Sequence, residues 1–154
     1  MKIIKTTAIG IMDGSIIGLV VGFLCFGFLS LLSLCSGLFQ QNPQLLYLLP
    51  LCGLFTVWIY KKYGEQAGLG NHLIIDEIHS PKKHIPLVMA PLIFVTTILS
   101  HLFGASVGRE GTAIQMGGSL AETIAKKLQI DPLRRKSYLI AGMAVSYTHL
   151  TLPT

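Results

Sequence analysis

The stretch Gly104-Ala-Ser-Val-Gly-Arg-Glu-Gly-Thr-Ala-Ile-Gln-Met-Gly-Gly118 decides the fold, because it sets two adjacent charges inside long uncharged sequence. Neither the range 85–107 nor the range 111–121 contains an Asp, Glu, Lys or Arg. Ionisable side chains at membrane depth are costly unless they are paired or hydrated, which makes them functional candidates. We therefore take Arg109 and Glu110 as the centre of a candidate ion site.

The composition is that of a membrane protein. The 154 residues are 51% hydrophobic and 12% charged, with a mean hydropathy of +0.63, whereas about 25% of residues are charged in a soluble domain. Residues 14–60 carry no charged side chain, and each helical crossing needs about 20 residues. Unpaired backbone groups cannot face lipid, and the alternation typical of a barrel is missing. We predict an all-α membrane protein.

The net charge of +5 comes from basic clusters near the ends of apolar runs. These clusters are Lys2 and Lys5, Lys61 and Lys62, Lys82 and Lys83, Lys126 and Lys127, and Arg134 to Lys136. If the first two clusters are cytoplasmic, the first two helices form a hairpin whose turn at residues 40–43 lies outside. No basic segment is interleaved with stacking aromatic residues, so we expect no nucleic-acid partner.

Cysteines and histidines show no metal-ligand spacing, so we expect neither a metal nor another cofactor. The cysteines lie in apolar stretches and are interpreted as buried packing residues: Cys25, Cys35 and Cys52. A polar connector is interpreted as a solvated loop: Asp76, Glu77, His79 and His84. His101 is predicted to be a hydrogen-bonded helix residue. The glycine-rich segments lack nucleotide-binding patterns, and the chain is predicted not to be an enzyme.

Glycines recur every four residues in the first predicted helix, which covers residues 7–39: Gly10, Gly14, Gly18 and Gly22. This spacing predicts a helix face that a neighbouring backbone can approach closely. Asp13 near the helix start is interpreted as an interfacial residue, with an ion or proton ligand as the alternative.

Further helices are predicted from the remaining apolar runs. They cover residues 44–60, 85–103 and 110–128, with a short half-helix within 64–79 and a last helix that Asp131-Pro132 opens. In the third run, Pro86 is placed in the first helical turn and Pro91 is expected to kink or break the helix.

Two glycine-flanked helix starts, 68–72 and 108–112, are the candidate functional site. Paired broken helices are typical of transporters, in which the amino ends of half-helices hold anions near the midplane. A carboxylate at Glu110 would compete with a bound anion for such an end, and its protonation would release the site. The alternatives are a structural ion pair of Arg109 and Glu110 at the membrane surface, or a scaffold subunit that transports nothing. Adjacent residues point in different directions on a helix, so these two need not pair.

The motif 108–118, together with Ala141-Gly-Met-Ala144, resembles the chloride channel and transporter (CLC) family. The resemblance covers residues 1–144 and implies the early helices of the first of two inverted halves. It implies that Glu110 is the external gate and proton acceptor. Anion-binding groups are implied in the same turn: Gly108, Arg109, Gly111, Thr112 and Ala113.

The chain departs from the family at the other half-helix, where Gly-Ser-Gly-Ile-Pro is usual and Gly68-Leu-Gly-Asn-His72 stands here. Leu69, Gly70 and Asn71 therefore take the place of the serine segment that contacts the anion. Thr112 stands where proline is common, and both changes resemble the bacterial fluoride/proton antiporter branch. We favour fluoride over chloride because Asn71 offers an amide donor to a small, strongly hydrated anion. A passive anion channel of the same fold is the alternative.

The resemblance further implies a multi-pass protein of the bacterial plasma membrane that moves a halide and protons. Its expected partners are membrane lipid and a second identical subunit. Residues 145–154 break the resemblance and are similar to translated adapter sequence. We expect them to be an artefactual tail on an amino-terminal fragment.

Overall fold

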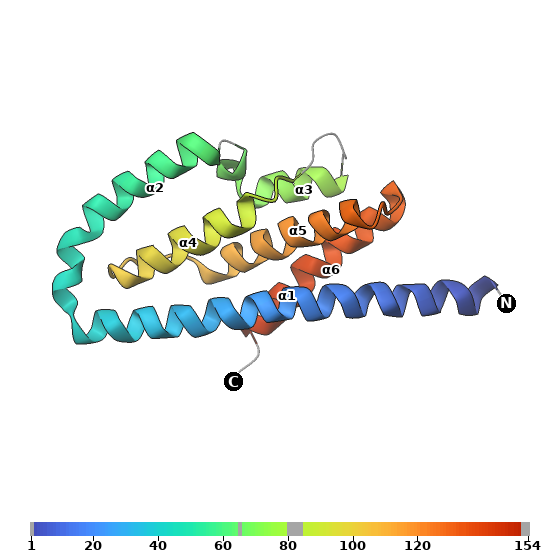
Figure 1. The fold of residues 1–154 in the computed structure, drawn as a ribbon, viewed down its shortest axis with the longest axis horizontal. Helices are drawn as coiled ribbons and strands as arrows, with labels where there is room; N and C mark the ends of the chain where they lie inside the picture. Colours follow the sequence, from blue (N-terminus) through green and yellow to red (C-terminus); the bar gives the residue numbers. More distant parts are fainter. Residues whose placement is uncertain (1, 65, 80–84, 152–154) are drawn as a thin grey trace.

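The computed structural model describes the backbone of residues 2–64, 66–79 and 85–151, and side chains between residues 10 and 150 of these ranges. Within them the chain forms helices and no strand (Figure 1), which confirms the predicted all-α class. The helices are α1 (Lys2–Gln41), η1 (Pro43–Leu48), α2 (Leu49–Tyr63), η2 (Ala67–Leu69), α3 (Asn71–His79), α4 (Met89–Leu102), α5 (Arg109–Lys127) and α6 (Pro132–Thr151). The basic loop Lys82–His84 and residues 152–154 of the predicted tail lie outside the described residues.

The first two long helices are joined by a turn at Asn42, as predicted, but they are splayed apart. α1 has 40 residues, a length of about 60 Å at the rise of an α-helix. After this turn the chain reverses direction, first as the 3-10 helix η1 and then as α2. α4 packs against both α1 and α2 and lies between them (Figure 1). The predicted hairpin is therefore opened by a third helix.

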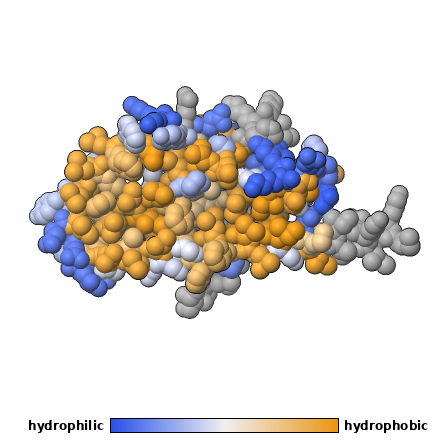
Figure 2. All heavy atoms as spheres, viewed as in Figure 1, coloured by the Kyte–Doolittle hydropathy of each residue, from blue (hydrophilic) through white to orange (hydrophobic). Residues whose placement is uncertain are grey.

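Two segments are long and apolar enough to cross a membrane, Gly10–Gln41 and Pro43–Tyr63. Both leave large apolar side chains exposed, among them Phe23 at 80% and Phe26 at 69%. Figure 2 shows this apolar surface as a broad area with hydrophilic residues gathered toward its ends. An apolar area of this extent is typical of a surface covered by lipid or protein.

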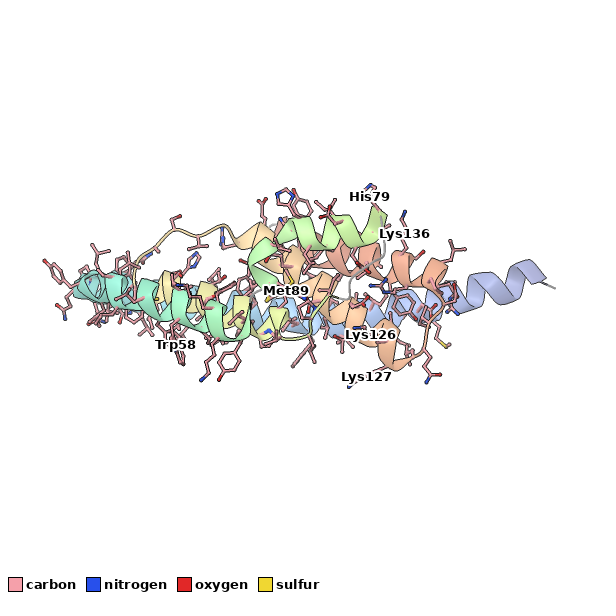
Figure 3. The ribbon with its side chains drawn as sticks, turned by 90° about the horizontal axis from the view of Figure 1, so that it is seen from above. Trp58, His79, Met89, Lys126, Lys127 and Lys136 are labelled. Atoms are coloured by element: carbon pink, nitrogen blue, oxygen red, sulfur yellow. The ribbon has the colours of Figure 1, made fainter. Side chains whose placement is uncertain are left out.

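Several basic residues near the carboxyl end of α5 and in α6 lie toward one end of the molecule. Figure 3 shows Lys126, Lys127, Lys136 and His79 toward the end at which α1 begins, and Trp58 in the opposite half. Lys62 lies beside the Trp58 ring, with 5.0 Å between Nζ and the ring centroid. Aromatic and basic side chains of this kind are typical of a membrane interface.

Close helix contact is found between α5 and α6, where Gly117 and Gly142 face each other. The Gly142 carbonyl occupies the space that a Cβ on Gly117 would take, so only glycine fits. The prediction of close backbone approach along α1 is wrong for the described residues. Gly22 meets the His149 imidazole, and a Cβ on the other three glycines would have no neighbour within 4 Å: Gly10, Gly14 and Gly18.

The two prolines near the start of α4 do not act as predicted. Pro86 precedes the helix in a turn, where its carbonyl accepts hydrogen bonds from Met89 N at 3.1 Å and from Ser119 Oγ at 2.9 Å. Pro91 is the third residue of α4. The N–H groups of the first turn have no acceptor within a helix, so Pro91 removes no hydrogen bond there. It opens the helix rather than kinking it.

Several predicted local features are confirmed. Asp131 caps α6, because its Oδ1 accepts hydrogen bonds from Leu133 N and Arg134 N, each at 3.1 Å. His101 is half-buried, with Nδ1 2.9 Å from the carbonyl oxygen of Thr97. Asp13 forms an ion pair with Arg134 that joins α1 to α6, while its place at the membrane interface stays a prediction. The cysteines are buried free thiols: Cys25, Cys35 and Cys52.

Candidate functional site

The candidate site lies where α3 and α5 begin, because the two helices run side by side in the same direction. Near their amino ends, a Cβ on Gly70 would lie 3.4 Å from Gln115 Nε2. One turn further along both helices, a Cβ on Gly118 would lie 2.8 Å from Ile74 Cδ1. The order of these contacts is the same along both helices, so the two predicted helix starts meet at one end of the pair.

Asn71 is the α3 residue that reaches α5. Its Nδ2 lies 3.5 Å from the position of a Cβ on Gly111. Its Oδ1 is buried without a hydrogen-bond partner among the described residues. The turn that delivers Asn71 depends on Gly70, whose φ of 60° is the left-handed region that glycine adopts at little cost. The structure therefore brings Gly70, Asn71 and Gly111 together.

The start of α5 is formed by Gly108, which has extended backbone, followed by Arg109 and Glu110 in the first turn. A helix that begins at Arg109 leaves the N–H groups up to Gly111 without helical acceptors. The next two N–H groups, of Thr112 and Ala113, point to carbonyls of the preceding turn, and both residues are buried. The free amides at this end therefore belong to residues 108–111.

Two threonine hydroxyls hold the start of α5 against α4. Thr112 Oγ1 donates to the carbonyl of Gly108 at 3.0 Å. Thr97 Oγ1 lies 3.1 Å from Thr112 Oγ1, and because the Thr112 proton is engaged, Thr97 is the donor. These two hydrogen bonds hold the turn of residues 108–112, which contains Glu110.

A hollow of ≈ 470 Å³ with both polar and apolar lining borders this turn. It lies between α2, α4 and α5, and its lining includes Thr56, Tyr60, Thr96, Ser100, Gly111 and Gln115. Hydroxyl and amide groups in an otherwise apolar zone can hydrogen-bond water or an ion there. The hollow therefore places polar groups beside the helix start.

Arg109 and Glu110 are both exposed, and no ion pair joins these two described residues. Arg109 lines a second hollow, of ≈ 380 Å³, together with Ser33, Ser36 and Gln40 of α1. The interpretation of the two charges as a structural ion pair therefore has no support in the structure. Leu69 is 52% exposed, unlike its half-buried neighbours Gly70 and Asn71.

Sequence reasoning missed Gln115 and the buried charges at the other end of α3 and α5. The interpretation of the polar connector as solvated is wrong for Glu77, which is 5% exposed, although Asp76 and His79 are exposed as expected. Gln115, Gly118 and Glu122 recur at positions i, i+3 and i+7. That helical spacing could have shown that they share one face of α5.

An all-helical fold with long apolar helices and two helix starts that meet beside a hollow is typical of membrane transport proteins built from broken helices. The profile of one family of this class, described as voltage gated chloride channel, matches residues 52–146. The chain belongs to this family, and it is therefore an integral membrane protein.

A curated relative and a solved structure agree with the family. The chain is 44% identical over 108 residues to the "Chloride/fluoride channel protein" of Pseudomonas syringae pv. tomato (strain ATCC BAA-871 / DC3000), which covers 70% of this chain and 24% of the relative. It is also similar to the crystal structure of a CLC-type fluoride/proton antiporter, with 29% identity and a TM-score of 0.86, over 96% of this chain and 37% of that one. The chain thus spans about a quarter of the curated relative's length.

Proposed function

We propose that this chain supplies the gate and part of the anion site of a halide transporter, with Glu110 as the proton-accepting gate. The observation that carries the proposal is the meeting of two helix starts, in which Asn71 Nδ2 comes within 3.5 Å of the Cβ position of Gly111. The names of the curated relative and of the similar crystal structure both refer to halide movement.

The gating role of Glu110 follows from electrostatics at a helix start. The amino end of α5 carries unpaired N–H groups and the positive end of the helix dipole, so it favours one negative charge. Glu110 stands in that first turn, and its carboxylate competes with a halide for the same amides. Protonation removes the competitor, because a neutral carboxyl group has little attraction to the helix end.

The proposed anion site takes its donors from the two helix starts. Gly108, Arg109 and Gly111 contribute backbone N–H groups, while the Arg109 side chain lies on the α1 side of this turn and adds positive charge to the region. From α3, Gly70 contributes the turn and Asn71 its side-chain amide. Three further residues are proposed as the wall around these donors: Leu69, Thr112 and Ala113.

Fluoride is the favoured substrate and chloride the alternative. A small anion with a high charge density needs strong, closely spaced hydrogen-bond donors to replace its hydration, and an amide such as that of Asn71 is one. The similar crystal structure is that of a fluoride/proton antiporter, which supports the same choice. The setting proposed is a multi-pass protein of the bacterial plasma membrane, with lipid and a second identical subunit as partners.

The proposal is tested by flux through a full-length chimera, in which this chain replaces the matching segment of the Pseudomonas syringae relative. The chimera is reconstituted into liposomes, and fluoride efflux and proton uptake are recorded separately. Glu110→Gln mimics the protonated gate, so it should abolish coupled proton uptake while halide efflux continues.

Asp76→Asn is the matched control, because Asp76 is an exposed carboxylate of α3 outside the proposed site. It should leave both fluxes unchanged. Proton uptake that survives in Glu110→Gln would overturn the role of Glu110. Halide efflux without proton uptake in the unsubstituted chimera would indicate a passive channel instead.

A further inference from the structure

The carboxyl-terminal halves of α3 and α5 are joined by a buried ionic cluster. Arg135 of α6 donates from Nε to Glu122 Oε2 at 2.7 Å and from Nη2 to Glu122 Oε1 at 2.9 Å. The same Nη2 donates to Glu77 Oε1 at 2.8 Å. The side chains of Glu77, Glu122 and Arg135 are 4%, 0% and 13% exposed, and Lys126 Nζ lies 3.7 Å from Glu122 Oε1.

This cluster is the last of three contact levels that set the register of α3 on α5. Ile74 and Glu77 share one face of α3, Gly70 immediately precedes that helix, and Gln115, Gly118 and Glu122 share one face of α5. Gly70 lies beside Gln115 and Ile74 beside Gly118, while Arg135 bridges Glu77 to Glu122. Among the described contacts of these three levels, only the third is a set of charge-assisted hydrogen bonds, so we expect it to contribute most to the register at the anion end.

α3 needs such a tie because it is short. It has nine residues, whereas isolated helices of fewer than about 12–15 residues are marginal in water. Its buried apolar side chains are Leu73 and Ile74, one turn from the helix start. Arg135 fixes the opposite end through a charge-assisted hydrogen bond, which is stronger than a neutral one.

We infer that Arg135, through Glu77 and Glu122, is a positioning residue for the anion site: it sets where the amino end of α3 places Asn71 against Gly111. This inference rests on the proposed function for its effect on anions, but the tie itself can be measured without transport. Loss of the tie lets α3 tilt or slide on α5, which moves the Asn71 amide from its place at the helix end.

The first readout is hydrogen exchange of the α3 amides in the full chain in micelles. Glu77→Gln keeps the size of the side chain and an oxygen that can accept from Arg135, but it removes the negative charge that strengthens the hydrogen bond, so exchange in residues 71–79 should rise severalfold. Arg135→Lys keeps the positive charge but loses the bidentate guanidinium, so it should give a smaller rise in exchange. Asp13→Asn is the matched control, because it removes the ion pair of the adjacent Arg134 with α1 and should leave α3 exchange unchanged.

The second readout is the ratio of fluoride to chloride flux in the chimera. This ratio does not depend on how much protein is folded, so a merely structural role would leave it unchanged. We expect Glu77→Gln and Arg135→Lys to lower it severalfold and Asp13→Asn to preserve it.

Unchanged α3 exchange in Glu77→Gln and Arg135→Lys would overturn the inference, and so would faster exchange with an unchanged flux ratio. A chimera that moves no halide before any substitution would instead count against the proposed function. The exchange experiment would then still decide whether Arg135 ties α3 to α5.

Discussion

The close contact between α5 and α6 can be tested by substituting a glycine at the point where the two helices meet. A Cβ at position 117 would meet the backbone carbonyl of Gly142, and it would lie 2.6 Å from Ser146 Oγ. Ordinary van der Waals contacts begin at 3.4 Å. Gly117→Ala therefore requires the two helices to separate, because a backbone carbonyl cannot rotate away as a side chain does.

The expected cost follows from two opposing terms. Overpacking typically costs about 1–3 kcal/mol, and a clash with backbone belongs to the upper part of that range, about 2–3 kcal/mol. Replacing glycine by alanine in a helix interior stabilises by about 0.5–1 kcal/mol, so the net loss should be about 1–2.5 kcal/mol. A change of 1 kcal/mol moves Tm by about 2–4 °C in a chain of about this size, so Gly117→Ala should lower Tm by roughly 2–10 °C. Gly18→Ala is the matched control: a Cβ there has no neighbour within 4 Å, so its Tm should stay or rise.

The assay is thermal loss of helical circular dichroism in one detergent, with both variants beside the unsubstituted chain. Equal shifts for Gly117→Ala and Gly18→Ala would refute the reasoning, because both changes add the same methyl group to a helix. A neutral Gly117→Ala would show that α5 and α6 are not in backbone contact.

Three further predictions concern the cap, the interface and the thiols. Asp131→Ala should lower the free energy of unfolding by about 1 kcal/mol, whereas Asp131→Asn should change it little, since asparagine also caps helices. Equal Tm values for the two variants would contradict the capping role. Trp58, which is 53% exposed, should be quenched by brominated lipids more than by aqueous iodide when the chain is in liposomes, and the reverse order would place it outside the membrane. The buried thiols should resist a bulky maleimide until SDS is added, and immediate labelling in mild detergent would contradict their burial: Cys25, Cys35 and Cys52.

The parts of the fold that were predictable from the sequence depend on local signals. The start of α6 could be predicted from Asp131-Pro132, because a capping side chain bonds only to the next three residues. The two helix starts near residues 71 and 109 could likewise be predicted from the glycines in 68–72 and 108–112, because a break in a helix is a local feature of the sequence. The family resemblance was confirmed because the motif at 108–118 lies within the matched range 52–146. The boundary at residue 144 remains a prediction, since α6 runs on to Thr151 and the family match ends at 146.

The parts that the sequence did not predict depend on partners distant along the chain. Glu77 and Arg135 are 58 residues apart, and the sequence around each of them alone indicates a solvated charge. The glycine spacing of α1 predicted a close neighbour, yet close approach needs small residues on both helices, as at Gly117 and Gly142. A glycine face on one helix is therefore a necessary condition for close packing and not a sufficient one.

The arrangement of α3 and α5 also explains why one negative charge belongs at the site under the proposed function. Two helices that start together place two dipole ends of about +0.5 elementary charge near each other, which is unfavourable unless an anion lies between or beside them. A single carboxylate or a single halide supplies the missing charge, and both together would exceed it. At the other end of the pair, Arg135 and Lys126 offset two carboxylates that would otherwise face the negative ends of the helices. The geometry thus favours one occupant at a time, which is the condition for an exchange between Glu110 and a halide.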